Sequence, residues 1–375
     1  MRIASALALT AAALVPAAAA TAAPGVGNGN STQPDISANG RFVVFTSAAT
    51  NLVSGDTNGK ADIFLRDTLN GTTRLVSKGL AGKPSNGASY APTVSDDGRY
   101  VAYLSAASNL VTGDTNSKVD AFRTDLTTGT TIRVSVGAKG AQPNRDVTSL
   151  AMNAAGTVFA FTTPATNLVA GDTNGASDTF YRPLTAAAPK RVSLTPSGAQ
   201  STGDTAGVTI SASGTIVGWL RLENNGEIWS WKSTTGKAVL VAESKYVPFS
   251  GTYPYEAVAS NGGVSWVSEE YPAGDTTFTI VSATGEFVER VDAVANDSFD
   301  VNRGGTLALF AGDGAGPYTR TATGVTHTLR GRAVADVALS GSGNTAAFVE
   351  TVNGTSQVRA WRLATNVVTD VSVAR

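Results

Sequence analysis

Short apolar strands separated by glycine-containing turns recur along the chain. The three clearest copies are Ile36–Phe45, Val94–Tyr103 and Met152–Phe161. In each copy a central glycine supplies the positive φ that a tight turn between two strands needs. In the segment Arg41–Phe45 both alternating faces are largely apolar, which is typical of a strand buried between two neighbouring sheets.

These copies belong to a longer repeat with a period of 58 residues. Each opening is followed by the phrase Asn-Leu-Val-x-Gly-Asp-Thr-Asn, which begins at Asn51, Asn109 and Asn167. An Asp-x-Phe strand comes next, and a strand of the pattern Arg-[Leu/Val]-[Val]-Ser, whose second Val is present only in the first copy, ends at Ser77, Ser135 and Ser193. The unit therefore predicts four short antiparallel strands, which is the content of one propeller blade.

Four shorter and more divergent units follow. Their openings keep a Ser or Asn three residues before a glycine, at Ser211/Gly214, Ser260/Gly263, Asn302/Gly305 and Ser340/Gly343. An aromatic residue follows each of these glycines, namely Trp219, Trp266, Phe310 and Phe348. The seven openings predict an all-β fold, a single β-propeller of seven four-stranded blades. We expect the propeller at residues 34–375, with blades at 34–91, 92–149, 150–207, 208–257, 258–299, 300–336 and 337–375.

The opening of the second unit carries a family resemblance. The segment Pro92–Tyr103 reads Pro-Thr-Val-Ser-Asp-Asp-Gly-Arg-Tyr-Val-Ala-Tyr. It resembles the WD40-like (PD40) propeller repeat of the TolB group, whose blades open with Ser-Pro-Asp-Gly-[Arg/Lys]-x-[Ile/Val]-Ala-[Phe/Tyr]. The resemblance implies a propeller that binds a protein or glycan outside the cytoplasm. Propellers also serve as lyases, hydrolases and peptidase covers, so the resemblance bears on fold more than on function.

The N-terminus has the pattern of a bacterial secretory signal peptide. Met1 and Arg2 give a short positive region, and an apolar run extends from Ile3 to Val15. This run is shorter than the ~20 residues needed to span a bilayer. We expect cleavage before Ala23, a signal peptide at residues 1–22, a linker at 23–33 and a secreted or cell-envelope location. No later stretch is apolar for long enough to cross a membrane, although a retained N-terminal anchor stays open as an alternative.

Composition narrows the possible chemistry. The chain of 375 residues has a net charge of −1, no cysteine and one histidine. The balanced charge gives no electrostatic basis for nucleic-acid binding, and the missing cysteines leave no thiol nucleophile. The single histidine, His327, lies in an alternating stretch that predicts an outer strand. We therefore expect a monomeric binding or scaffold protein and assign no catalytic residue.

One repeated loop contains oxygen-rich side chains at fixed spacing. It runs from Gly55 to Asp62 and recurs at residues 113–120 and 171–178. The side chains concerned are Asp56, Asn58 and Asp62 in the first copy, Asp114, Asn116 and Asp120 in the second, and Asp172, Asn174 and Asp178 in the third. The loop resembles the calcium loops of integrin-type propellers but is two residues shorter, and calcium needs six to eight oxygens. The alternative is a purely structural turn, because Asp and Asn side chains commonly bond their own backbone.

Aromatic residues in the fourth unit are the remaining candidates for binding. Trp229 and Trp231 lie on one face of a predicted third strand, and packing between blades is the expectation for both. A Tyr/Phe cluster follows in a Pro-containing segment, where stacking on a ligand is the alternative to packing; it comprises Tyr246, Phe249, Tyr253 and Tyr255. Three functional classes stay open: a non-catalytic binding propeller, a carbohydrate-active lyase or glycosidase, and a calcium-stabilised cell-surface module.

Overall fold

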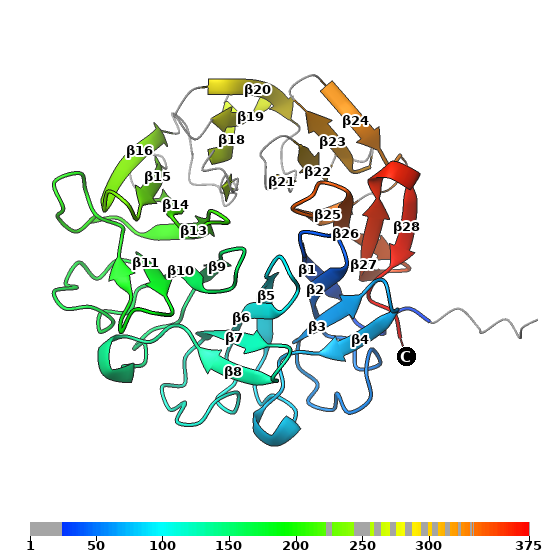
Figure 1. Cartoon of the computed structure of the whole chain (residues 1–375), viewed down its shortest axis with the longest axis horizontal. Helices are drawn as coiled ribbons and strands as arrows, with labels where there is room; N and C mark the ends of the chain where they lie inside the picture. The colour runs from blue at the N-terminus through cyan, green and yellow to red at the C-terminus, as the bar shows by residue number, and fades with distance from the viewer. Residues whose placement is uncertain are drawn as a thin grey trace, which may run out of the picture.

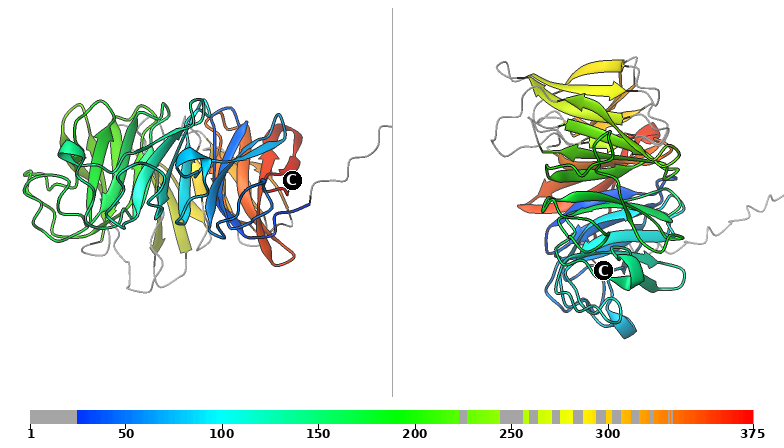
Figure 2. Two further views of the ribbon diagram at one scale, coloured as in Figure 1. Left: turned by 90° about the horizontal axis from the view of Figure 1, so that it is seen from below. Right: turned by 90° about the vertical axis from the view of Figure 1, so that its left-hand side faces the viewer.

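Seven four-stranded antiparallel sheets are arranged around a central axis (Figure 1). The computed structural model describes residues 25–222, 227–243, 256–258, 264–270, 275–281, 287–293, 299–301, 307–311, 316–321, 324–330, 332 and 334–374. Figure 2 shows the ring edge-on as a flat disc. The prediction of a seven-bladed propeller is confirmed. The expected signal peptide and the Tyr/Phe cluster of the fourth unit lie outside the described residues.

Each blade is built from four consecutive strands, with the first strand nearest the axis and the fourth at the rim (Figure 1). Blades 1 and 2 comprise β1 (Ser31–Ile36), β2 (Phe42–Ser47), β3 (Asp62–Asp67), β4 (Thr72–Leu75), β5 (Ser89–Val94), β6 (Tyr100–Ser105), β7 (Asp120–Asp125) and β8 (Thr130–Arg133). Blades 3 and 4 comprise β9 (Ser149–Met152), β10 (Val158–Thr163), β11 (Asp178–Pro183), β12 (Lys190–Arg191), β13 (Thr205–Ile210), β14 (Ile216–Arg221), β15 (Glu227–Lys232) and β16 (Lys237–Glu243).

The second half of the ring repeats this order. Blades 5 and 6 comprise β17 (Glu256–Val258), β18 (Val264–Glu270), β19 (Asp275–Val281), β20 (Phe287–Ala293), β21 (Phe299–Val301), β22 (Ala308–Phe310), β23 (Tyr318–Thr321) and β24 (Gly324–Thr328). Blade 7 comprises β25 (Val334–Leu339), β26 (Thr345–Val352), β27 (Thr355–Arg362) and β28 (Val367–Asp370). Three 3₁₀ turns, η1 (Leu80–Gly82), η2 (Ala138–Gly140) and η3 (Leu363–Thr365), are the helical elements among the described residues.

The first strands begin slightly earlier than the blade boundaries expected from sequence. β1 begins at Ser31, inside the segment interpreted as a linker, and β5 begins at Ser89 and crosses the boundary expected between residues 91 and 92. The reason is that the innermost strand of these two blades pairs along the whole length of the second strand, so that Ser31 lies opposite Ser47 and Ser89 opposite Ser105. The glycine turn shows where the first strand ends, but it gives no signal for the residue at which that strand begins.

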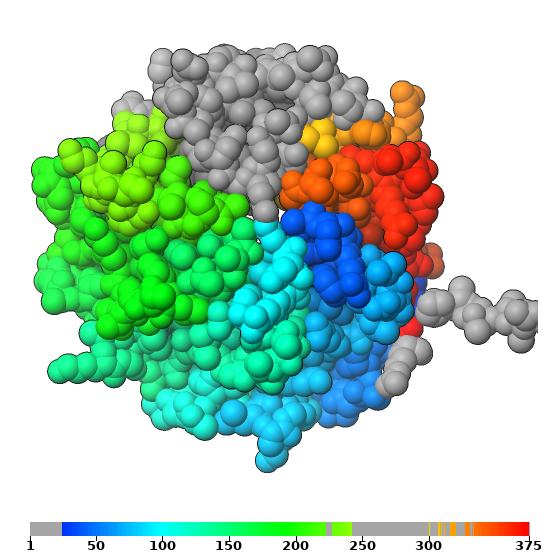
Figure 3. Space-filling model, in the orientation of Figure 1, coloured from blue at the N-terminus to red at the C-terminus, as the bar shows by residue number. Residues whose placement is uncertain are grey.

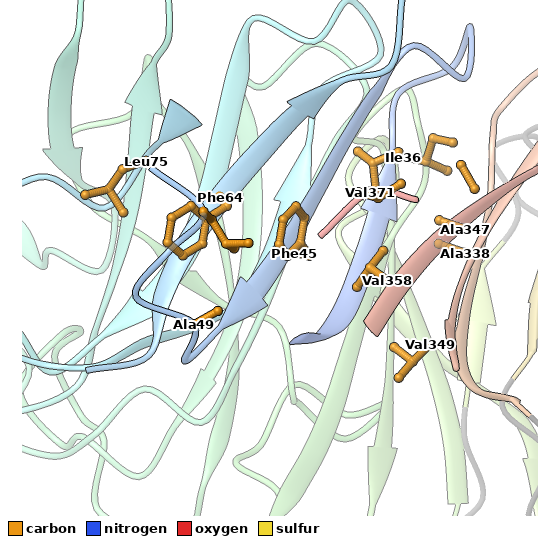
Figure 4. Packing of buried hydrophobic residues seen from close by; sticks show 13 residues of the cluster. Ile36, Phe45, Ala49, Phe64, Leu75, Ala338, Ala347, Val349, Val358 and Val371 are labelled. Atoms are coloured by element: carbon orange, nitrogen blue, oxygen red, sulfur yellow. The ribbon is translucent and has the colours of Figure 1, made fainter. Parts of the chain in front are cut away.

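The second strand of a blade is buried on both faces, as its sequence predicts. In β2, Val43 and Phe45 pack in a cluster shared with Val358 of blade 7. Val44, on the opposite face, packs with Tyr103 of blade 2. Figure 4 shows the first of these clusters between blades 7 and 1. The hydrophobic core is therefore a series of layers between blades, each built from two adjacent sheets.

The recurring turn glycine has a cause beyond its own backbone. Gly98 has a φ of +74°, and a Cβ placed there would lie 2.1 Å from Cδ2 of Phe42 in the preceding blade. Gly156 makes the equivalent approach to Tyr100, with 2.6 Å to Cδ2. Each glycine thus allows one blade to approach the second strand of its neighbour. Gly214, which opens the first divergent unit, makes a similar approach, with 3.0 Å from its added Cβ to Val158 of blade 3.

The repeated Asn-Leu-Val phrase fastens each connector to the following blade. In blade 2 the Asn109 side chain accepts a hydrogen bond from the Asn86 backbone at 3.0 Å and donates one to the Pro84 carbonyl at 3.0 Å. Asn86 in turn accepts one from the Ser108 backbone at 2.9 Å. The same pairing joins Asn28 to the Asn51 segment in blade 1 and Asn144 to the Asn167 segment in blade 3.

The ring closes between blade 7 and blade 1 without a covalent link. Residues 25–30 run beside the end of blade 7, where Val26 forms an antiparallel bridge with Val373. The side-chain amide of Gln357 donates to the Gly27 carbonyl at 3.2 Å. Figure 3 shows the N-terminal and C-terminal blades side by side at this closure. Among the described residues, no helix is long and apolar enough to cross a membrane.

Candidate cation-binding loops

The nine predicted metal ligands lie in three equivalent loops. Loop 1 (residues 55–62), loop 2 (113–120) and loop 3 (171–178) each lead from the second strand of a blade into the third. The last Asp of each loop is the first residue of the third strand. The structure therefore brings each predicted trio together at one place on blades 1, 2 and 3.

This last Asp is a buried anchor for the end of the blade. The Asp62 carboxylate accepts hydrogen bonds from the Ser77 hydroxyl at 2.6 Å and the Ser85 hydroxyl at 3.0 Å. Ser77 in turn accepts the backbone N–H of Ile63 at 3.0 Å. Ser135 holds Asp120 in the same way at 2.7 Å, and Ser193 holds Asp178. The Ser that ends each fourth-strand pattern therefore binds the last Asp of the loop. The two residues are too far apart along the chain for the sequence alone to indicate this contact.

The Asn of each loop faces its own backbone. Asn58 accepts the backbone N–H of Lys60 through Oδ1 at 2.8 Å and donates through Nδ2 to Asp62 at 2.7 Å. Asn116 and Asn174 make the same two contacts in loops 2 and 3. The amide oxygen that a cation would need is therefore engaged in a turn, and two carboxylates remain in each loop. Within the described part of the chain, no cluster of three or more His, Cys, Asp or Glu side chains is placed to hold a metal ion.

In loop 2 an arginine lies between the two carboxylates. Arg133, from the end of β8, places its guanidinium 3.7 Å from Asp114 and 3.3 Å from Asp120. The arginine side chain is 7% exposed and both carboxylates are more deeply buried. Buried charges need such compensation, because desolvation penalises each of them strongly.

Loop 3 repeats this arrangement with Arg191. Its Nη1 lies 3.1 Å from Asp172 and 3.4 Å from Asp178, and its Nη2 lies 3.4 Å from the carbonyl oxygen of Gly171. The guanidinium position is therefore bounded by two carboxylates and one backbone carbonyl. These three groups all present oxygen atoms to the guanidinium, so the position favours a positive charge.

Loop 1 lacks this arginine. Leu75 occupies the position, because Leu75 lies opposite Phe64 in blade 1 as Arg133 lies opposite Phe122 in blade 2. The sequence pattern aligns Arg74 with Arg133, and this alignment is wrong by one residue. On a strand one residue reverses the face, and Arg74 instead donates to the Leu126 carbonyl at 3.3 Å.

A second polar clamp is also missing from loop 1. In loop 2 the Gln142 side chain donates to the Gly113 carbonyl at 2.9 Å and accepts the backbone N–H of Thr115 at 3.0 Å. Gln200 forms the corresponding contacts in loop 3. Pro84 stands at this position in blade 1. Proline has no side-chain donor or acceptor, so it cannot form this clamp.

The electrostatics of the loops follow from these differences. Burial raises the pKa of Asp120 to about 6, although Ser135 and Arg133 act in the opposite direction. In loop 1 burial raises the pKa of Asp56, and the neighbouring charge of Asp62 raises it further. Arginine lowers the pKa of the equivalent carboxyls, Asp114 and Asp172, against the larger effect of burial.

Other candidate residues have structural partners. Trp229 and Trp231 are buried in the cluster between blades 3 and 4, which confirms the expectation of packing. His327 lies on β24, the outer strand of blade 6, as predicted. Its Nδ1 is 3.2 Å from the Thr319 hydroxyl, and its ring meets the edge of Trp361 at 6.4 Å between centroids.

No protein-family model matches the chain, and no curated protein matches it. Solved propeller structures do match. The β-propeller domain of the Trilobed protease from Pyrococcus furiosus aligns with a TM-score of 0.61 at 10% identity, over 93% of this chain and 97% of that one. Oligogalacturonate lyase from Vibrio parahaemolyticus aligns with a TM-score of 0.60 at 11% identity, over 93% and 91%.

A prolyl endopeptidase aligns with a TM-score of 0.60 at 12% identity, over 91% of this chain and 49% of its own. This chain thus spans about half the length of that enzyme. TolB from Acinetobacter baumannii aligns less well, with a TM-score of 0.42 at 18% identity over 70% of this chain and 53% of its own. The matches with TM-scores of 0.60 and 0.61 show the propeller fold, and at their identities of 10% to 12% they show nothing further.

Proposed function

We propose that the chain is an exported, non-catalytic propeller that binds a protein or glycan ligand at a loop face or in the central channel. The observation that supports this proposal is the structural use of the buried polar groups. Asp62 is bonded to Ser77, and Glu227 accepts the indole N–H of Trp229 at 2.7 Å. A catalytic acid or base must instead be free to reach a substrate proton.

We place the ligand site on blades 4 to 7 or in the channel. Blades 1 to 3 share one loop design, and their loops are occupied by contacts that hold the blade together. A specific binding surface requires residues that differ between units, and the later units are the ones that diverge. A ligand-bound structure with the site entirely on blades 1 to 3 would contradict this placement.

A lyase or glycosidase is the second candidate function. The observation in its favour is the alignment with oligogalacturonate lyase over 93% of this chain and 91% of the enzyme. The single histidine, His327, weighs against it, because its ring is packed against Thr319 and Trp361 at the interface of blades 6 and 7. A carbohydrate-active member of this fold would have to rely on Asp, Glu, Tyr or Lys for proton transfer.

Glycan and peptide arrays probed with the full chain, with and without calcium, test the binding proposal. We expect saturable binding to one ligand class and recovery of that ligand unchanged. The parallel assay incubates the chain with acidic and neutral polysaccharides and follows reducing ends and the ultraviolet absorbance of unsaturated sugars. Product that accumulates in proportion to chain concentration would replace the binding proposal with the enzyme class.

A further inference from the structure

The three loops of blades 1 to 3 form a comparison within one molecule. Two of them enclose an arginine guanidinium between their carboxylates, and the third has the carboxylates without the arginine. The Asn turn and the Ser anchor are shared, so the loops differ in the side chains that lie beside the carboxylates and the glycine carbonyl. The carboxylates of loop 1 therefore lack the arginine that neutralises the equivalent carboxylates in loops 2 and 3.

The missing positive charge in loop 1 is most evident at the buried carboxylate of Asp56. The residue is 6% exposed, and its buried Oδ1 has no hydrogen-bond partner. Oδ1 of Asp172 in loop 3 also has no hydrogen-bond partner, but it forms an ion pair with Arg191, whose Nη1 lies 3.1 Å away. Among the described residues no basic side chain forms an ion pair with Asp56 or Asp62, and Lys60 and Lys83 on the nearby chain are exposed.

The size of Leu75 distinguishes loop 1 from the other two loops. This side chain is 8% exposed and packs at the end of the cluster beside Phe64, as Figure 4 shows. Leucine replaces the aliphatic stem of the arginine but has nothing in place of the guanidinium. The Leu75 side chain is therefore too short to reach the position that the guanidinium takes in loops 2 and 3.

We propose that loop 1, and not loop 2 or loop 3, binds one hard divalent cation, best fitted by calcium, at the position that the guanidinium takes in the other two loops. The protein ligands are the carboxylates of Asp56 and Asp62 and the carbonyl oxygen of Gly55, which corresponds to the Gly171 carbonyl beside Arg191. Two carboxylates balance a charge of two, and water completes a calcium shell from so few protein oxygens. An arginine from a partner protein fits less well, because Oδ1 of Asp56 is closed off from the surface.

The missing clamp supports the same assignment. Gln142 and Gln200 occupy the Gly113 and Gly171 carbonyls in loops 2 and 3, whereas Pro84 leaves the Gly55 carbonyl without this side-chain donor. Blade 1 thus differs at two positions, and both differences free oxygen atoms toward the same point. This inference is independent of which ligand the propeller binds.

Calorimetric titration of the chelator-treated full chain with calcium chloride tests the proposal. We expect one site per chain, with a dissociation constant of about 10⁻⁴ to 10⁻³ M, the range of extracellular modules with few charged ligands. Chelator should lower the melting temperature, and excess calcium should restore it. No heat and no melting shift, or a stoichiometry of three, would overturn the proposal.

Two variants remove the site by different means. Leu75→Arg should supply the guanidinium of loops 2 and 3, abolish calcium binding and make the melting temperature insensitive to chelator. Asp56→Asn should abolish calcium binding by removing a ligand. Binding retained in a folded Leu75→Arg variant would show that the ion lies elsewhere and would refute the assignment.

A third variant should create a site. Arg133→Leu combined with Gln142→Pro gives loop 2 the residues of loop 1, and we expect the stoichiometry to rise from one to two. Circular dichroism establishes whether this variant is folded. A folded variant that still binds one ion would contradict the proposal, and the two variants in loop 1 decide the matter where loop 2 does not fold.

Discussion

At the scale of single residues, the buried serine after the fourth strand of blades 1 to 3 contributes more to stability than its small size indicates. Ser135 donates to the Asp120 carboxylate at 2.7 Å and accepts the Ala121 backbone N–H at 3.1 Å. One hydroxyl thus satisfies a buried charge and a buried amide together. Leaving such groups unpaired costs more than the hydrogen bonds themselves contribute.

We therefore expect Ser135→Ala to lower the free energy of unfolding by about 2 to 3 kcal/mol, because a buried carboxylate and an amide lose their partner. Urea denaturation followed by tryptophan fluorescence measures the change. The matched control is Ser108→Ala, which removes an exposed hydroxyl bonded to Asn86 and should cost less than about 0.5 kcal/mol. Equal losses in the two variants would contradict the role assigned to the buried serine.

A surface ion pair gives the chain a component of its acid sensitivity. The Arg41 guanidinium holds the pKa of Asp67 down at about 2, with the backbone N–H groups of Asn70 and Leu69 acting in the same direction. A depressed carboxyl pKa contributes stability above its unfolded value of about 4, and that contribution is lost as the pH falls toward 2.

Asp67→Asn should therefore destabilise the chain by about 1 kcal/mol at pH 7, since the pair is partly exposed and screened. The difference from the unsubstituted chain should shrink as the pH falls from about 4 to about 2 and vanish below it, because the carboxyl is then protonated in both the folded and the unfolded chain. Denaturation midpoints across this range test the expectation. A difference that is constant with pH would assign the effect to the turn backbone and exclude the charge.

At the scale of elements, the strands were predictable from the sequence, but the face of the fourth strand on which Arg74 lies was not. The 58-residue repeat, the glycine turns and the alternation in β2 all follow from local patterns, and each is confirmed. The pairing of Arg133 with the loop was missed because Arg74 stands one place earlier relative to the following serine. Pattern matching tolerates such a shift, whereas a strand with a period of two does not.

The glycine turns illustrate a second limit of local reasoning. A positive φ at Gly98 is predictable from the turn, but its approach to Phe42 depends on how blades pack. Gly98→Ala should therefore cost about 2 to 4 kcal/mol, the sum of left-handed strain and overpacking.

Gly129→Ala is the matched control for this substitution. Gly129 has a similar φ of +72°, and a Cβ added there would meet nothing within 4 Å. About 1 kcal/mol of backbone strain is therefore the whole expected cost. Thermal unfolding of both variants measures the difference. Similar costs would show that the contact between blades contributes nothing beyond the turn.

At the scale of the whole molecule, ring closure reuses the design of the internal blade junctions. Elsewhere a loop Asn donates to the connector of the next blade, as Asn116 does to the Pro143 carbonyl at 3.1 Å. At the closure Gln357 donates to Gly27 and also accepts the Ser372 hydroxyl at 2.8 Å. One glutamine thus makes the contacts that an Asn and an Asp share in blades 1 to 3.

Loss of one such hydrogen bond should therefore have different effects at an internal blade junction and at the ring closure. Asn116→Ala removes a contact between blades that the chain also joins covalently, and its effect should stay local. Gln357→Ala weakens a junction held by non-covalent contacts, so β1 and β25 to β28 should open together. Hydrogen exchange read by mass spectrometry should show faster exchange in those strands for Gln357→Ala, while Asn116→Ala leaves them protected. Equal protection of blades 1 and 7 in the two variants would mean that the apolar layer around Phe45 and Val358, rather than the connector, holds the ring closed.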